Sequence, residues 1–364
     1  MGRLEPVRRR ALIAGGRKRP SHLIMKAAMV GPMGGVTMED VPEPSPAEGE
    51  VLVKLKCCGV CGTDLEKVQG VGITTKILGH EAVGEVEEVG RGVTNISKGM
   101  RVFAHHHVPC LSCEVCKRGK TTYCAEFARH NLLPCGLAER FIVPKFNVDR
   151  GAVIELPEGL GYEEASFIEP LSCCILGLEN ARASGARSAV IYGAGPVGLM
   201  IYKLLRHGGV TKVAVGDVSE YRNSFSRRVG CDLVFDPADQ KDKERVVNGS
   251  MPDGPELVVV ATASAAAFED ATRLAARGGT VLLFGAPKRG ATGTIDLARL
   301  FLNGTSVVTS YASSERETQV ATKLLADKAL AVTDLITHRF PLSDSEQAFA
   351  TAGQQQCMKA LIMD

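Results

Sequence analysis

The segment "SAVIYGAGPVGLM", residues 188–200, constrains the fold of this chain most strongly. Its three glycines form a G-x-G-x-x-G pattern between an apolar run typical of a buried strand and a helical run. Three further apolar runs, "KVAVGD", "ELVVVATA" and "GTVLLFGAP", alternate with helical stretches such as "AAAFEDATRLAA" up to about residue 310. This alternation predicts an α/β fold with a doubly wound parallel sheet covered by helices on both faces.

The glycine pattern predicts a dinucleotide site. Gly193 allows a tight turn, Gly195 lets the backbone approach a pyrophosphate, and Gly198 lets helix and strand pack closely. The free N–H groups at the helix start favour phosphate. The expected phosphate-loop residues are Gly193, Gly195, Pro196, Val197 and Gly198. The alternative is an ordinary glycine turn between a strand and a helix.

The end of the next strand carries an acid that indicates the coenzyme. Asp217 follows Gly198 by nineteen residues, where a carboxylate accepts hydrogen bonds from the adenosine ribose. A carboxylate there repels a 2′-phosphate, which favours NAD over NADP. Arg222 lies five residues further on and is able to accept a 2′-phosphate, so NADP stays open.

Residues 25 to about 175 follow a different pattern. Short Val-rich runs such as "GEVLVKLKCCG" and "AVGEVEEVGRGV" alternate with glycine and proline turns, which predicts a β-rich domain. The tail after residue 311 contains one clear helix, "ERETQVATKLLADKAL". A chain of 364 residues that is 45% hydrophobic is long enough to form two such domains, each with its own core.

The segment "CLSCEVCKRGKTTYC", residues 110–124, carries the densest metal signal. Its cysteines follow the spacing C-x2-C-x2-C-x7-C, and four thiolates form a closed tetrahedral zinc site that leaves no position for a substrate. An iron–sulfur cluster is the rival metal, although the gap of seven residues counts against it. Free thiols in a loop are the remaining alternative. The four expected ligands are Cys110, Cys113, Cys116 and Cys124.

A second group of possible ligands is dispersed along the chain. Cys61 lies in "CCGVCGTD", His80 and Glu81 lie in "LGHEAVGEV", and Glu169 lies in "SFIEPLSCC". Each of these residues alone is as consistent with a core or surface position as with a ligand. The cysteines without a motif are expected in the core: Cys57, Cys58, Cys135, Cys173, Cys174, Cys231 and Cys357.

Taken together, these motifs resemble a known family. "CGVCGTD", "GHE", the four-cysteine segment, "EPLSC", "GAGPVG" and "THRFPLSDSEQAF" occur in the order found in zinc-dependent medium-chain alcohol dehydrogenases. The likeness runs from about Met25 to the C-terminus and is greatest to the polyol (sorbitol) and threonine dehydrogenase branch. It implies a GroES-like β-rich catalytic domain, residues 25–174 and 312–364, and a Rossmann coenzyme domain, residues 175–311. The active site would lie in the cleft between them.

The resemblance also implies the site residues. Cys61 and His80 would bind a catalytic zinc together with Glu81 or Glu169, so that the chain would hold two zinc ions, one catalytic and one structural. Thr63 matches the hydroxyl residue that takes the substrate proton in this family. Many members carry a histidine relay where this chain has Glu66, so the onward proton route differs here. His107, three residues before Cys110, is the candidate for contact with the substrate.

The function implied is hydride transfer between a secondary alcohol or polyol and NAD(P). Two alternatives stay open: reduction of a short aldehyde or semialdehyde, and a non-catalytic cofactor-binding relative. A small-molecule substrate and a homo-oligomer, dimer or tetramer, are also implied, with the strand around "TSVVTSYA" as the pairing edge.

Charge and cysteine use limit the other classes of function. The net charge of +2 does not indicate a nucleic-acid-binding protein, and no apolar run reaches the length of a membrane helix. Twelve cysteines in so long a chain indicate a reducing cytoplasm rather than a disulfide scaffold. Residues 1–24 carry seven Arg or Lys against one acid, Glu5. This basic extension is expected to be disordered, either as a transit peptide or as an overlong start.

Overall fold

The computed structural model describes residues 23–70, 76–354 and 356–364. The basic N-terminal extension therefore lies outside the described residues except for its last two positions. The first strand begins at Ile24, one residue before the expected start of the fold. Within the described part of the chain, no helix combines the length and apolar character that a bilayer crossing requires.

The middle of the chain forms the parallel sheet that the glycine segment predicts. Its six strands lie in the order β10-β9-β8-β11-β12-β13, and every neighbouring pair is parallel. Alternate residues of β8 face opposite ways, so that Ile191 packs with α5 and α6 while Val190 packs on the α9 side. The strands are β8 (Ser188–Tyr192), β9 (Lys212–Gly216), β10 (Leu233–Phe235), β11 (Leu257–Val260), β12 (Thr280–Leu283) and β13 (Ser306–Thr309).

The second sheet is mostly antiparallel and joins residues from both ends of the chain. Its order is β14-β15-β3-β4-β5-β7, with β6 paired to β3, and only the pair β14–β15 is parallel. A separate hairpin, β1–β2, lies beside it. The strands are β1 (Ile24–Val30), β2 (Val36–Pro42), β3 (Val51–Gly59), β4 (Glu81–Val89), β5 (Arg101–Ala104), β6 (Arg140–Val143), β7 (Val153–Glu155), β14 (Ile336–Pro341) and β15 (Lys359–Met363).

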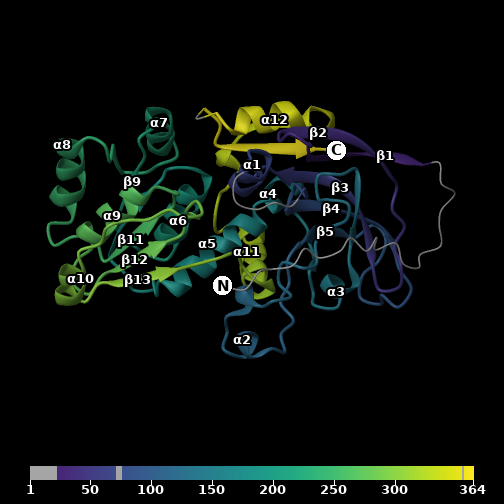
Figure 1. Ribbon diagram of the computed structural model, residues 1–364, viewed down its shortest axis with the longest axis horizontal. Helices are drawn as coiled ribbons and strands as arrows, with labels where there is room; N and C mark the ends of the chain where they lie inside the picture. The colour runs from purple at the N-terminus through teal and green to yellow at the C-terminus, as the bar shows by residue number, and fades with distance from the viewer. Residues whose placement is uncertain (1–22, 71–75, 355) are drawn as a thin grey trace.

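Helices connect and cover the two sheets. Figure 1 shows the parallel sheet on one side, the mixed sheet on the other, and α5 and α11 between them, with α2 on a projecting segment. The helices are α1 (Gly62–Val68), α2 (Glu114–Lys117), α3 (Lys145–Val148), α4 (Tyr162–Ala165), α5 (Ile168–Asn180), α6 (Pro196–His207), α7 (Glu220–Arg228), α8 (Gln240–Lys243), α9 (Ala265–Leu274), α10 (Leu297–Asn303), α11 (Glu315–Ala326) and α12 (Ser345–Ala352).

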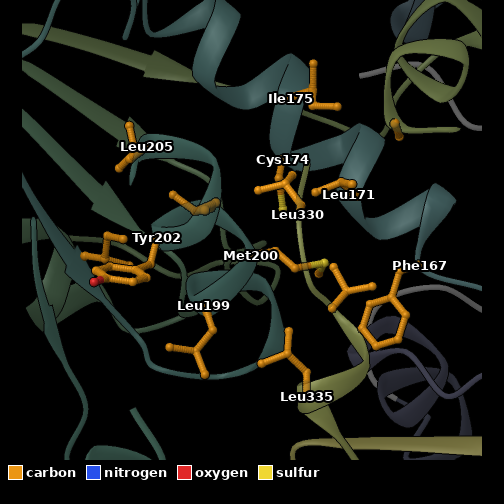
Figure 2. Close-up of a cluster of buried hydrophobic side chains, with 14 of the residues drawn as sticks. Phe167, Leu171, Cys174, Ile175, Leu199, Met200, Tyr202, Leu205, Leu330 and Leu335 are labelled. Atoms are coloured by element: carbon orange, nitrogen blue, oxygen red, sulfur yellow. The ribbon is translucent and has the colours of Figure 1, made fainter. Parts of the chain in front are cut away.

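One hydrophobic core continues from one sheet to the other. It joins Cys57 and Phe103 of the mixed sheet to Ile191 and Leu282 of the parallel sheet through residues of α5 and α6. Figure 2 shows the central part of this cluster, where Leu171 and Cys174 of α5 face Met200 of α6 and Leu330. Because α5 packs on both sides, the two sheets are held in a defined relation around it.

Candidate active site

Three potential metal ligands converge where β3 and β4 pair. Cys61 caps the start of α1, two residues beyond the end of β3, while His80 and Glu81 stand at the start of β4. The antiparallel register places Gly59 opposite Glu81 and so brings the two segments together. The ligand atoms of Cys61, His80 and Glu81 all lie within 4.8 Å of one another.

The chemistry of this group fits a zinc ion. A thiolate, an imidazole and a carboxylate are the donors that catalytic zinc sites use, with a fourth position left open. Oε1 of Glu81 is buried and has no hydrogen-bond partner among the described residues. A buried carboxylate oxygen without a partner is costly unless a cation occupies the adjacent space. The residues therefore fit a metal, which would contact Cys61, His80 and this oxygen.

Two carboxylates of this region pair with lysines, Asp64 with Lys67 and Glu81 with Lys359. Neither lysine was predicted from the sequence. Oδ2 of Asp64 lies 3.2 Å from Nδ1 of His80, and Nζ of Lys67 lies 2.8 Å from Oδ1 of Asp64. Lys359 donates a hydrogen bond to Oε2 of Glu81. Asp64 lies in the motif "CGTD", so the sequence contained a local indication of this residue. Lys359 comes from the last strand and carried no such signal.

Glu169 lies near this group but outside it. It occupies the first turn of α5 and is buried, and its Oε1 accepts a hydrogen bond from the thiol of Cys173 at 3.4 Å. Of the two glutamates, only Glu81 lies with Cys61 and His80 in this structure. Cys173, which was expected to be an ordinary core residue, lies beside Glu169. Its thiol also lies 3.7 Å from the Ser313 hydroxyl oxygen.

The two residues expected to move a proton differ in their placement. Thr63 Oγ1 lies 3.4 Å from both Cys61 Sγ and His80 Nε2, directly at the ligand group. Glu66 is half-buried one turn further along α1, and its side chain makes no hydrogen bond or ion pair with another described residue. Thr63 is thus placed to contact a bound substrate, whereas nothing in the described part of the chain links Glu66 to Thr63.

The triple histidine after β5 does not converge on one point. His105 Nδ1 lies 3.0 Å from Glu315 Oε1, the His106 ring centroid lies 5.0 Å from that of His80, and His107 Nε2 faces the Asn131 amide at 3.5 Å. Burial lowers the pKa of His107 to about 3 and the pKa of His106 well below its usual value. Both rings are therefore neutral near pH 7 and are suited to hydrogen bonding rather than to charge.

The four-cysteine segment forms a second compact donor group around α2. The sulfur atoms of Cys110, Cys113, Cys116 and Cys124 lie within 4.8 Å of one another, and all four thiols are free. The Ser112 hydroxyl and the amides of Ser112 and Cys113 lower the pKa of Cys110 to about 5. Burial and the neighbouring thiols raise the pKa of Cys116 to about 12. Four thiolates can therefore coexist here only around a cation, which fits a closed zinc site.

The glycine loop has the geometry that a dinucleotide requires. Gly193 has a φ of +101°, and a Cβ there would lie 2.7 Å from the Ala261 carbonyl oxygen. A Cβ on Gly198 would lie 1.9 Å from the Gly193 carbonyl oxygen, so helix and strand pack without room for a side chain. A Cβ on Gly195 would have open space around it, with the Arg222 guanidinium 3.9 Å away as the nearest group. Pro196 and Val197 form the first turn of α6.

Asp217 is held against this loop. Its Oδ2 accepts a hydrogen bond from the Ala194 amide at 2.9 Å, and its Oδ1 accepts one from the Ser219 amide at 3.0 Å. Arg222 Nη1 lies 3.3 Å from Oδ2. The carboxylate is therefore fixed at the carboxyl end of β9, beside the open face of Gly195, where parallel sheets bind nucleotides.

A separate surface hollow lies away from these groups. A hollow of about 720 Å³ opens at the amino-terminal edge of the parallel sheet, beside Arg187, Lys212 and Glu256. It contains none of the residues that the sequence predicts for function. Since α/β sheets bind ligands at the carboxyl ends of their strands, we place the active site at the metal-ligand group and the glycine loop.

Comparisons with known proteins found two family models that match separate parts of this chain. Residues 47–157 match the family described as alcohol dehydrogenase GroES-like domain, and residues 196–327 match the family described as zinc-binding dehydrogenase. An L-threonine 3-dehydrogenase from Aeromonas salmonicida is 28% identical over 335 residues, which cover 90% of this chain and 96% of the relative.

Solved structures share the whole architecture. A Sinorhizobium meliloti protein described as a zinc-binding dehydrogenase and bound to NADP is 26% identical, with a TM-score of 0.85 over 94% of this chain and 100% of the other. The alcohol dehydrogenase TADH from Thermus sp. ATN1 is 25% identical, with a TM-score of 0.83 over 93% of this chain and 99% of the other. The chain is an oxidoreductase and belongs to the superfamily of zinc-dependent medium-chain dehydrogenases.

Proposed function

We propose that this enzyme uses NAD to oxidise a secondary alcohol or polyol at a zinc ion held by Cys61, His80 and Glu81. The observation that carries the proposal is the convergence of three different donors, one of them a buried carboxylate oxygen without a partner. A bound zinc ion supplies Lewis-acid polarisation of the substrate oxygen at such a site. Glu169, which lies near Glu81, is available to replace it as a ligand.

The surrounding residues have distinct tasks in this proposal. Thr63 holds the hydroxyl proton of the substrate, because its Oγ1 lies beside both Cys61 and His80. Water or Glu66 carries that proton away. As a neutral imidazole, His107 accepts a hydrogen bond from another polar group of the substrate or donates one to it. The loop from Gly193 to Gly198 binds the pyrophosphate of the coenzyme.

The coenzyme preference rests on Asp217. Its fixed carboxylate is placed for the ribose hydroxyls and repels a 2′-phosphate, which favours NAD. Arg222 lies against the same carboxylate and neutralises part of its charge, so weaker use of NADP is expected. The Sinorhizobium meliloti structure holds NADP, which supports leaving the phosphorylated coenzyme open here.

The substrate class follows from the relatives and from the polar surroundings of the ligand group. L-threonine, the substrate named for the Aeromonas salmonicida relative, carries a secondary alcohol, and so do polyols. Reduction of a short aldehyde or semialdehyde uses the same groups in reverse and remains the second candidate. A non-catalytic role is disfavoured because all proposed ligands of the catalytic zinc are present.

The remaining proposals concern zinc count, domains and assembly. A second, structural zinc would occupy the four-cysteine segment, giving two per chain. The proposed division assigns residues 25–174 and 312–364 to the catalytic domain and residues 175–311 to the coenzyme domain. Among the described residues, the outer strand β13 pairs on one side only, and Phe301 and Leu302 of the adjoining α10 are exposed. Such an edge favours pairing with a second copy in a cytoplasmic dimer or tetramer.

One assay series tests the central proposal. Purified protein is analysed for zinc, and coenzyme reduction is measured against secondary alcohols, polyols, 3-hydroxy amino acids and sugars, with NAD and NADP in parallel. Two zinc ions per chain and turnover of a secondary alcohol with NAD are expected. A single zinc with no turnover of any alcohol or aldehyde would favour the non-catalytic alternative.

A further inference from the structure

A buried lysine stands behind the proposed catalytic metal site. Asp64 and Lys67 lie on the same face of α1, three residues apart, and Nζ of Lys67 lies 2.8 Å from Oδ1 of Asp64. The other oxygen of Asp64 faces His80 at 3.2 Å. Among the described residues, neither Oδ2 of Asp64 nor Nδ1 of His80 makes a hydrogen bond, so the close approach at 3.2 Å is the contact that joins these two buried atoms. Lysine, aspartate and histidine thus form a continuous chain that ends at a proposed ligand.

Lys67 also holds the backbone that leads to this ligand. Its Nζ donates a second hydrogen bond to the carbonyl oxygen of Ile77 at 3.1 Å. Ile77 precedes His80 by three residues, so one ammonium group fixes both the carboxylate behind the imidazole and the chain that carries it.

The burial of this lysine is informative. The Lys67 side chain is only 10% exposed and that of Asp64 is fully buried. Taking a lysine out of water costs free energy that an exposed helix-surface ion pair avoids. A carboxylate that accepts a hydrogen bond from a zinc-binding histidine fixes the orientation of the ring and raises its basicity. A cation on the opposite oxygen restricts that carboxylate further and withdraws part of its charge.

We propose that Lys67 is a positioning residue for the catalytic metal, acting through Asp64 on the imidazole of His80. It sets the ring orientation and the donor strength of one ligand without touching the metal. This inference rests on the proposed zinc site at Cys61, His80 and Glu81, and it adds a residue that lies outside every metal-ligand motif of the sequence.

The test compares Lys67→Met and Lys67→Arg with the wild type, using the whole zinc-loaded protein. Zinc affinity of the catalytic site is measured by competition with a chromophoric chelator. The ligand field of that site is read from the visible absorption of protein in which cobalt(II) replaces the catalytic zinc. Lys67→Met should weaken zinc binding about 10-fold or more and shift the cobalt bands, while the structural zinc is retained. Lys67→Arg keeps the charge and should restore most of both properties.

A matched control separates positioning from general stability. Lys243 is 13% exposed and forms a comparable ion pair with Asp270 at 3.0 Å, remote from the ligands in the parallel-sheet region. Lys243→Met should lower thermal stability without changing zinc affinity or the cobalt spectrum. If Lys67→Met behaved like Lys243→Met, the positioning role would be overturned while the zinc site stood. A wild type that binds only the structural zinc would instead overturn the proposed function and this inference together.

Discussion

Nζ of Lys359 donates a hydrogen bond to Oε2 of Glu81, although the two residues are 278 positions apart. Both side chains are almost fully buried. Although burial opposes its charge, the Glu81 carboxylate and Cys61 raise the pKa of Lys359 above its usual value. A Cβ on Gly59 would lie 1.8 Å from the same carboxylate oxygen, so this position on β3 has no room for a side chain. The C-terminal strand therefore helps to position a metal ligand near the start of the chain.

Replacing Lys359 with methionine should destabilise the protein by about 3–5 kcal/mol in the absence of zinc, because Glu81 is left as a buried, unpaired charge. The loss should be smaller in excess zinc, since the metal then compensates the carboxylate. Urea unfolding with and without zinc measures both values. Lys26→Met removes an exposed ion pair with Asp40 and should cost less than about 1 kcal/mol. An equal loss for Lys359→Met with and without zinc would contradict the proposed contact of Glu81 with the metal.

Cys61→Ser and Cys113→Ser should each remove one zinc ion, but with opposite consequences. Cys61→Ser should lower activity roughly 10³-fold or more, because Lewis-acid stabilisation of several kcal/mol is lost, while the melting temperature changes little. Cys113→Ser should lower the melting temperature, because the segment around α2 loses the zinc ion proposed to link its four cysteines. Zinc analysis, turnover and thermal unfolding of both variants give the comparison. Loss of both ions from either variant would argue against two independent sites.

Asp217→Ser should shift the coenzyme preference toward NADP. The variant loses charged hydrogen bonds to the ribose, each worth about 1.5–3 kcal/mol, so kcat/KM for NAD should fall roughly 10- to 100-fold. It also loses the repulsion of a 2′-phosphate, which Arg222 would then face directly. Steady-state kinetics with both coenzymes measure the ratio, and Arg222→Gln in the same background should abolish the gain for NADP. An unchanged ratio in Asp217→Ser would refute the role given to this carboxylate.

Stability should fall in acid partly because of His107. Burial lowers its pKa to about 3 in the folded state, whereas an unfolded histidine titrates near 6.5. Between these values the unfolded chain binds one more proton than the folded protein. The free energy of unfolding therefore decreases as the pH is lowered from 6.5 through this range. The slope from one such group is at most about 1.4 kcal/mol per pH unit.

His107→Gln should flatten this acid slope. Unfolding of the variant and the wild type is compared in urea between pH 4.5 and 7.5 with excess zinc, so that metal loss affects both proteins alike. His130→Gln is the control, because the His130 side chain is partly exposed and lies between Glu126 and Phe146, which are themselves only partly buried. Parallel pH profiles for wild type and His107→Gln would contradict the buried, neutral state of this imidazole.

Phe301→Asp should dissociate the oligomer that the β13 edge is proposed to form. Phe301 is 84% exposed on α10, and a carboxylate there would be desolvated and repelled by its symmetry mate across a two-fold interface. Sedimentation velocity of the variant should show a smaller species than the wild type. Met33→Asp, at a fully exposed position of the β1–β2 turn, should leave the assembly intact. A wild-type protein that sediments as a monomer would contradict the proposed assembly.

Local patterns in the amino-acid sequence were enough to predict several features of this protein. Apolar runs between helical stretches predicted the parallel sheet of β8 to β13, and the spacing of Gly193, Gly195 and Gly198 predicted the turn into α6, because backbone conformation and close packing there depend on neighbouring residues. The four cysteines from 110 to 124 come together for the same reason, since they lie within one short segment.

Contacts between residues far apart in the sequence became visible in the folded structure. It placed Glu81 rather than Glu169 with Cys61 and His80, and it brought the Glu315 carboxylate to His105 and the Asn131 amide to His107. Lys359 has no local pattern that connects it to Glu81. Such contacts depend on strand register and on side-chain direction between segments far apart in sequence, and spacing along the chain carries no information about either.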